Sequence, residues 1–168
     1  MRSLILCTLV LLAGALAADE LKSQYITLDN TKLLAKPAAF SKTMKTLNDK
    51  YKSDNVVWLA INSSNYVTND QDQKWAAEQG ITYPILNDAP GTVGHLYGAT
   101  NTPQMFIIGR DGVLLYKGGI DNDRGGKKEG ADKINYVDQG LSEIMAGKPV
   151  SVPESEPYGC TVKYKGVH

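Results

Sequence analysis

Cysteine is the residue type with the most chemistry to offer here, and the chain has two, Cys7 and Cys160. Cys7 falls in a leader that the sequence predicts to be removed, which leaves Cys160 as the one thiol. A single thiol cannot close an intramolecular disulfide, so a self-contained dithiol cycle is excluded. Three interpretations stay open: a one-cysteine peroxidase, a mixed disulfide with a partner, and a plain tail thiol that is free or capped.

The polar segment 121–132 is the candidate for a metal site. It fits a calcium-loop pattern in part, with oxygen-bearing residues at its positions 1, 3, 9 and 12 and Gly126 at position 6. Two adjacent lysines and Arg124 oppose a divalent ion, so we expect a solvated, glycine-rich loop instead. His95 and His168 do not form a zinc site of recognisable spacing with Cys160. We expect no metal and no other cofactor.

Charge and surface motifs narrow the class of partner. The 168 residues contain 18 Lys+Arg and 18 Asp+Glu, so the chain lacks the basic surplus of a dedicated nucleic-acid binder. Asn62-Ser63-Ser64 fits the acceptor pattern for N-glycosylation, which matters only if the secreting cell is eukaryotic. The partners we expect are a thiol or disulfide compound, or a peptide or protein.

Residues 1–18 have the pattern of a secretory signal peptide. Arg2 supplies a positive charge, an apolar run extends from Leu4 to Leu16, and Ala15-Leu16-Ala17 is a small-residue cleavage pattern. The run is too short for a retained membrane span, which needs about 20 apolar residues. We therefore expect cleavage near Ala17 or Ala18, and an exported protein, periplasmic or secreted, that is not held at a membrane after cleavage.

Hydrophobic periodicity predicts the elements of the first half of the chain. Gln24–Leu28 fits a short strand, and the apolar run Val56–Ile61 fits a strand that is covered on both faces. A helix is expected from Pro37 to Tyr51, because its apolar residues recur every three or four positions. A second helix is expected to start at Thr68 or Asn69 and to end at Gly80.

The second half of the chain predicts shorter elements and a hairpin. Tyr83–Leu86 fits a short strand and Gly91–Tyr97 a short helix. Gln104–Ile108 and Val113–Tyr116 flank an Asp-Gly turn, which is the strongest hairpin signal in the chain. A last helix is expected over Asp132–Met145, and Ile134 and Val137 are among its core residues. This alternation predicts an α/β fold with a mixed central sheet flanked by helices.

A family resemblance appears once these segments are read in order. Val56–Asn62, Tyr83–Leu86, Tyr97–Ile108, Asp111-Gly112 and Tyr116–Gly118 resemble the thioredoxin superfamily, in its redoxin branch of alkyl hydroperoxide reductase and thiol-specific antioxidant (AhpC/TSA) type. The tail from Gly147 to Tyr164 resembles that of exported bacterial members. The resemblance implies a thioredoxin-like fold, with a redoxin domain over 19–150 and a C-terminal tail over 151–168.

The resemblance also implies a binding platform and a missing nucleophile. The proline that matches Pro103 is cis in the family, and Thr102 would offer its backbone groups to an extended peptide or a small thiol. The loop where the family carries its nucleophilic cysteine, often as Cys-x-x-Cys, aligns with Asn30, Thr31 and Lys32, and it contains no sulfur. Cys160 is therefore the only candidate for catalysis.

Three functional hypotheses follow. The first is an exported oxidoreductase of thiol-redox or antioxidant type, of thiol-disulfide oxidoreductase or peroxidase lineage, that uses Cys160. The second is a redox-inactive binding module that recognises a peptide or protein at Thr102 and Pro103. The third is that residues 19–37 represent a truncated N-terminus, so that relatives carry a catalytic cysteine that is absent here. Whether the protein is an enzyme is left open by the sequence.

Overall fold

The computed structural model describes residues 5–7 and 37–165, which form an α/β fold of short strands and helices. Its helices are α2 (Pro37–Tyr51), α3 (Asn69–Glu78), α4 (Thr92–Leu96) and α5 (Tyr136–Met145), with 3-10 turns at Lys52–Asp54 and Gly130–Asp132. Its strands are β1 (Ile5–Cys7), β2 (Val56–Val57), β3 (Ala60–Asn62), β4 (Ile85–Asn87), β5 (Asn101–Thr102), β6 (Met105–Ile108), β7 (Leu114–Gly118) and β8 (Cys160–Thr161). Within the described ranges, no helix has both the length and the apolar character that crossing a membrane requires.

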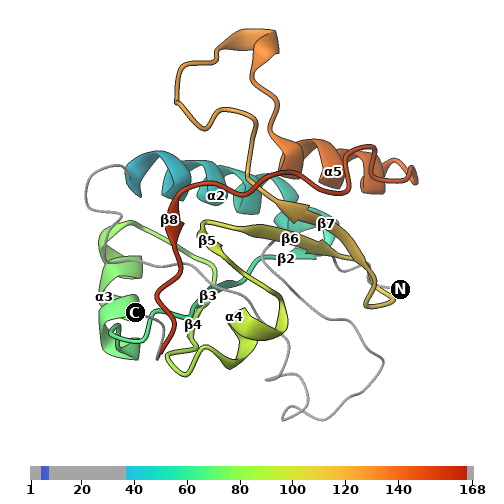
Figure 1. Ribbon diagram of the computed structural model, residues 1–168. Coiled ribbons are helices and arrows are strands. Elements are labelled where there is room, and N and C mark those ends of the chain that lie inside the picture. The colour runs from blue at the N-terminus through green and yellow to red at the C-terminus, as the bar shows by residue number, and fades with distance from the viewer. Residues whose placement is uncertain (1–4, 8–36, 166–168) are drawn as a thin grey trace.

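The strands form a mixed arrangement, which confirms the expected fold class (Figure 1). A four-stranded sheet has the order β2-β1-β6-β7, in which β1 is parallel to β2 and β6 is antiparallel to both of its neighbours. β3 and β4 pair in parallel, and β5 pairs with β8 in the antiparallel direction. β1 belongs to the leader predicted from the sequence, whereas Gln24–Leu28 lies outside the described residues.

The continuous strand expected over Val56–Ile61 is wrong in one respect, because the structure divides it into β2 and β3. The two halves have different partners: β2 pairs with β1, whereas β3 pairs with β4. Trp58 and Leu59 lie between the two halves, and both side chains are buried. Hydrophobicity therefore marked the burial of this run correctly, but it could not show where the ladder changes partner.

Both faces of β6 are buried, and this gives the molecule its layers. Met105 and Ile107 pack in the cluster that contains Leu47 of α2 and Leu141 of α5. Phe106 and Ile108 pack in a second cluster on the opposite face, with Leu59, Ile61, Val93 and Ala99. Alternate residues of a strand point to opposite faces, so one strand supplies both cores. In Figure 1, α2 and α5 accordingly lie on one side of β6 and α4 on the other.

Local signals set the ends of the first helices and of the hairpin. α2 spans the predicted Pro37–Tyr51. Thr68 caps α3 in a complete capping box with Gln71, and Gly80 follows the helix with a φ of 61°. The turn of the β6–β7 hairpin is closed by a 2.8 Å hydrogen bond from the Gly109 N–H to the Val113 carbonyl. These elements are confirmed because the side chains that specify them act over a few residues.

The last helix begins later than the sequence predicted. α5 starts at Tyr136, because the Asn135 side chain accepts a hydrogen bond from the Asp138 N–H at 2.9 Å and so caps the helix. Ile134 lies before the cap and is exposed rather than part of the core. Val137 is fully buried, as expected, and so is Leu141.

Leu141 provides a direct test of this core. Its side chain is 0 % exposed, so Leu141→Ala should lower the free energy of unfolding by about 2–5 kcal/mol, because it removes buried methyl groups and leaves a cavity. Leu96→Ala is the matched control, since Leu96 is 65 % exposed and its truncation should change stability by less than about 0.5 kcal/mol. Urea denaturation of both variants measures the difference. Equal losses would show that α5 does not carry the core.

Candidate functional site

The loop that joins β5 to β6 contains the one cis peptide bond within the described residues, between Thr102 and Pro103. Thr102 is 1 % exposed and ends β5. The Gln104 side-chain oxygen accepts hydrogen bonds from the Thr100 N–H at 2.9 Å and from the Thr100 hydroxyl at 3.2 Å. These bonds close the loop on itself, so the backbone around Pro103 is held by its own neighbours.

Cys160 lies directly across from this loop. β8 pairs with β5 in an antiparallel register that sets Cys160 opposite Thr102 and Thr161 opposite Asn101. The Val162 N–H extends the pairing with a 3.0 Å hydrogen bond to the Thr100 carbonyl. Cys160 is a free, half-buried cysteine. The structure thus brings together three residues that the sequence proposed separately: Cys160, Thr102 and Pro103.

Gly159 determines how closely β8 approaches the loop. Its φ is +119°, which L side chains rarely adopt, and a Cβ built there would overlap the carbonyl oxygen of Thr102. Only glycine fits this contact without displacing one of the two chain segments. Gly159 therefore sets the separation between the Cys160 strand and the Pro103 loop, although it was not among the residues predicted from the sequence.

Aromatic residues fix the C-terminal segment on both sides of Cys160. Before the thiol, the buried Tyr158 hydroxyl donates a hydrogen bond to the Asp121 carboxylate. After it, the buried Tyr164 ring stacks on His95 with centroids 3.8 Å apart, and its hydroxyl donates to the Ala99 carbonyl at 2.7 Å. Burial raises the pKa of Tyr164 to about 12, so this donor keeps its proton at neutral pH.

The alternation of the C-terminal segment was a signal that could have revealed β8. Tyr158, Val162 and Tyr164 are buried, while Gly159, Thr161 and Lys163 between them are exposed. A period of two over seven residues is typical of a strand with one covered face. Pro157 and Gly159 are residue types that weaken a strand, so the alternation is a weak strand signal in the sequence.

Gly159→Ala should loosen β8 and leave the rest of the fold in place. The overlap with Thr102 would break the pairing, so we expect faster alkylation of Cys160 by iodoacetamide and faster hydrogen exchange at the Val162 amide. Gly126→Ala is the control, because Gly126 has a similar positive φ of +64° but a Cβ added there would meet nothing within 4 Å. It should lose only about 1–2 kcal/mol of backbone energy. A Val162 amide that is equally protected in the Gly159 variant and in the wild type would contradict the prediction.

In the segment 121–132, two carboxylates form ion pairs with Lys133, the residue that follows the segment. The Lys133 ammonium lies 3.0 Å from an Asp123 oxygen and 3.6 Å from an Asp121 oxygen. Asp123 also accepts the Lys127 and Lys128 backbone N–H groups at 2.7 and 3.2 Å. Lys133 therefore supplies the positive charge that these two carboxylates require. In the part of the chain that the structure describes, no group of three or more His, Cys, Asp or Glu side chains is placed to hold a metal ion.

The Asp123 contacts predict a pH dependence of stability. Burial alone would raise the Asp123 pKa, but Lys133 and the two backbone donors outweigh it and lower the pKa to about 2 from 3.8. Because the folded pKa is depressed, this stabilisation is complete above about pH 4 and is lost as the pH falls toward 2.

The test compares urea midpoints at several pH values between 4 and 2. We expect the midpoint of Asp123→Asn to fall less steeply than that of the wild type, since the asparagine cannot titrate. Asp54→Asn, at an exposed position, should keep the wild-type slope. Identical slopes for wild type and Asp123→Asn would rule out this contribution.

Asn62 is a structural residue and not an accessible glycosylation site. Its side chain is fully buried, donates to Asp72 at 2.7 Å, and accepts from the Ser64 N–H at 3.0 Å. Asn87 donates to the same Asp72 carboxylate at 3.0 Å. This buried polar cluster joins the ends of β3 and β4 to α3, so a sugar on Asn62 is incompatible with the folded chain.

Other residues selected from the sequence lie elsewhere. Asn30, Thr31 and Lys32, where the resemblance predicts the nucleophile loop, lie outside the described residues, as does His168. His95 packs against Tyr164 as part of the anchor for the C-terminal segment. Trp58 is buried in the core.

Comparison with known proteins supports the fold. Residues 35–117 match the AhpC/TSA family. A hypothetical protein, SMc02350, from Sinorhizobium meliloti 1021 is similar in structure, with a TM-score of 0.72 and 19% identity over 99% of this chain and 81% of that one. An uncharacterized conserved protein from Geobacillus kaustophilus has a TM-score of 0.68 and 21% identity over 99% of this chain and 79% of that one. A thioredoxin-like protein in its oxidized form has a TM-score of 0.51 and 13% identity over 88% of this chain and 80% of that one. At these identities the structures show the fold alone, and no curated protein matches the sequence.

Proposed function

Since this chain belongs, through residues 35–117, to the AhpC/TSA family and has a thioredoxin-like fold, we propose that it is a redoxin that works through one thiol, Cys160. Its reaction is disulfide exchange with a compound that docks beside Thr102 and Pro103. By the resemblance, the family's nucleophile would lie in the loop predicted at Asn30–Lys32, which contains no sulfur. Here the C-terminal strand would supply it instead.

The pairing of Cys160 with Thr102 is the observation that supports this proposal most strongly. By the resemblance, the backbone of the residue before the cis proline would bind an extended substrate. In this chain the β5 backbone meets β8, and the thiol is opposite that residue. A tail thiol without a role would not need a glycine contact and two buried tyrosines to hold it at this position.

The proposed reaction balances without a second protein thiol. The Cys160 thiolate attacks one sulfur of a disulfide RS–SR, a bond forms between Cys160 and that sulfur, and RS⁻ leaves with the electron pair. A second thiolate then attacks the mixed disulfide, which releases Cys160 as a thiolate and forms a new disulfide. The chain contributes one sulfur and a backbone platform, and the partners supply the remaining sulfur atoms.

Hydroxyethyl disulfide provides the test of this function. The protein with Cys160 intact and its Cys160→Ser variant both carry Cys7→Ser, so that an adduct reports on Cys160 alone. We expect one mixed disulfide on the folded protein, released by added thiol, and no adduct after Cys160→Ser. The folded protein should also react faster than the same protein unfolded in urea. Equal rates in the two states would show that the site contributes nothing and that Cys160 is a plain tail thiol.

The family name also raises the possibility of peroxide chemistry. A peroxide would transfer one oxygen to the Cys160 thiolate and leave as an alcohol or water, which gives a sulfenic acid that a thiol then reduces. The same pair of proteins tests this alternative. Thiol-dependent consumption of hydrogen peroxide that disappears with Cys160→Ser would extend the proposed activity to peroxides.

The alternative function is a redox-inactive module that binds a peptide or protein at Thr102 and Pro103. In the structure, β8 takes the hydrogen-bonding edge of β5, so an external strand could pair there only after β8 leaves. This alternative predicts that a partner cross-linked to the protein is retained by Cys160→Ser and bound more tightly by Gly159→Ala. The thiol proposal predicts that Cys160→Ser loses the partner.

We propose export on the sequence pattern of residues 1–18. Removal of this segment would also remove β1, which lies between β2 and β6 in the full chain. The intact mass of the protein purified from its own cells tests processing, because cleavage near Ala17 or Ala18 gives a defined loss. A full-length mass would reject the proposal.

A further inference from the structure

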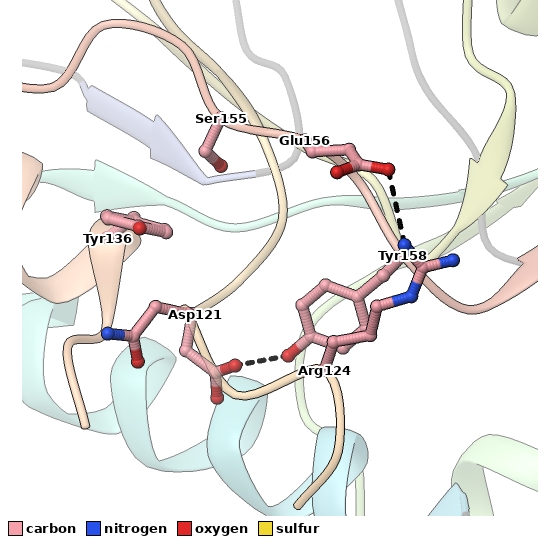
Figure 2. Close-up of a pocket in the computed structure, with 7 residues that line it drawn as sticks. Asp121, Arg124, Tyr136, Ser155, Glu156 and Tyr158 are labelled. Carbon is pink, nitrogen blue, oxygen red and sulfur yellow. Dashed lines mark hydrogen bonds and ion pairs between the residues drawn. The ribbon is translucent and has the colours of Figure 1, made fainter. Parts of the chain in front are cut away.

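A small cavity lies next to the segment that carries Cys160. Its volume is about 190 Å³, and it is bordered by the loop after β7, the start of α5 and the C-terminal segment. Its lining residues are Asp121, Asn122, Arg124, Tyr136, Ser155, Glu156 and Tyr158 (Figure 2). The volume is below the roughly 300 Å³ of a site for a drug-sized ligand, so it suits a group of amino-acid size.

The inner part of the cavity is built from groups that are already paired. Asp121 is buried and accepts the Tyr158 hydroxyl, and Lys133 lies on its other oxygen. The Ser155 hydroxyl bonds to the Tyr116 hydroxyl at 2.6 Å and accepts the Gly119 N–H at 3.0 Å. Because the polar groups of these walls already have hydrogen-bond or ion-pair partners within the protein, they define the shape of the cavity. Polar recognition of a ligand therefore falls to the side chains at the mouth.

The mouth of the cavity carries one positive and one negative side chain. Arg124 and Glu156 point toward each other in Figure 2 and form an ion pair at 3.2 Å. Their side chains are 69% and 82% exposed, so the pair contributes little to stability and its members are free to exchange partners. A ligand that carries both a carboxylate and an ammonium group can replace each partner with a group of the same charge. Arginine in addition offers two parallel donors to a carboxylate.

The chain itself limits the distance from this mouth to the thiol. Tyr158 and Glu156 precede Cys160 by two and four residues. An extended chain spans at most about 3.6 Å per residue, so the Cα atoms of these residues lie within about 7 Å and about 14 Å of Cys160. A peptide of about three residues spans about 11 Å, and the length of the Glu156 side chain makes up the rest of that range. A ligand whose charged end is held by Arg124 and Glu156 can therefore place its sulfur at Cys160.

We propose that this cavity is the recognition site for the small disulfide with which Cys160 reacts, and that the ligand is a short peptide disulfide with a free α-amino-acid end. The inference rests on the proposed function and specifies its substrate class. Arg124 binds the α-carboxylate, Glu156 binds the α-ammonium group, and the rings of Tyr136 and Tyr158 enclose the stem. The Cys160 thiolate then attacks the ligand disulfide, and the other half of the ligand leaves as a thiolate.

The experiment compares two disulfides on the Cys7→Ser background. Glutathione disulfide has the proposed charged end, and hydroxyethyl disulfide has none. We expect the rate of mixed-disulfide formation at Cys160 to saturate with glutathione disulfide. Arg124→Gln or Glu156→Gln should lower the rate at low concentration about five-fold, which is the size of an exposed charge pair. Neither variant should change the rate with hydroxyethyl disulfide. Arg110→Gln, in the exposed turn between β6 and β7, is the matched control and should keep both rates.

A binding measurement makes the site testable without the reaction. In Cys160→Ser, S-methylglutathione should shift the NMR signals of the Arg124, Glu156 and Tyr158 amides, and Arg124→Gln should remove these shifts. If Cys160 reacts with both disulfides but Arg124→Gln changes neither rate, the cavity proposal fails and the thiol function stands. If Cys160 reacts with neither disulfide, both the proposed function and this inference are wrong. Absence of any shift in the Cys160→Ser protein would also overturn the cavity proposal.

Discussion

The backbone contact between Gly159 and Thr102 is the constraint on which the candidate site depends. Because no side chain intervenes, β8 lies close enough to pair with β5, and the pairing sets Cys160 opposite Thr102. The path of the C-terminal segment follows from this contact. Tyr158 is directed to Asp121 on one side, and Tyr164 is directed to His95 and Ala99 on the other. The cavity and the thiol are therefore consequences of one close approach of two backbones.

The rigidity of this contact comes from the strand that follows Pro103. β6 has buried side chains on both faces, so its position is defined by two separate clusters of apolar residues. The loop with the cis bond is joined directly to that strand and is closed further by Gln104. A site on such a support is held more closely than one on a free loop, because movement of the loop would disturb both cores. The candidate site thus lies beside a strand that is buried on both faces.

Local signals in the sequence were sufficient for much of this fold. The capping box of α3, the apolar spacing of α2 and the Asp-Gly turn of the hairpin each act within a few residues, and the structure contains all three elements. Non-local choices were not predictable in the same way. The division of Val56–Ile61 depends on which strands lie beside it. The start of α5 depends on a competition in which the Asn135 cap excluded the preceding apolar residue.

The candidate site was predicted in its parts and not in its assembly. Thr102, Pro103 and Cys160 were selected for their residue types and for a resemblance, but their proximity depends on a pairing across almost sixty positions, between Thr102 and Cys160. A pairing between segments so far apart in the sequence also affects the order of folding. During synthesis β5 leaves the ribosome well before β8, so it waits without its partner while the residues between them are made. The thiol therefore joins its site after the Pro103 loop has already been made.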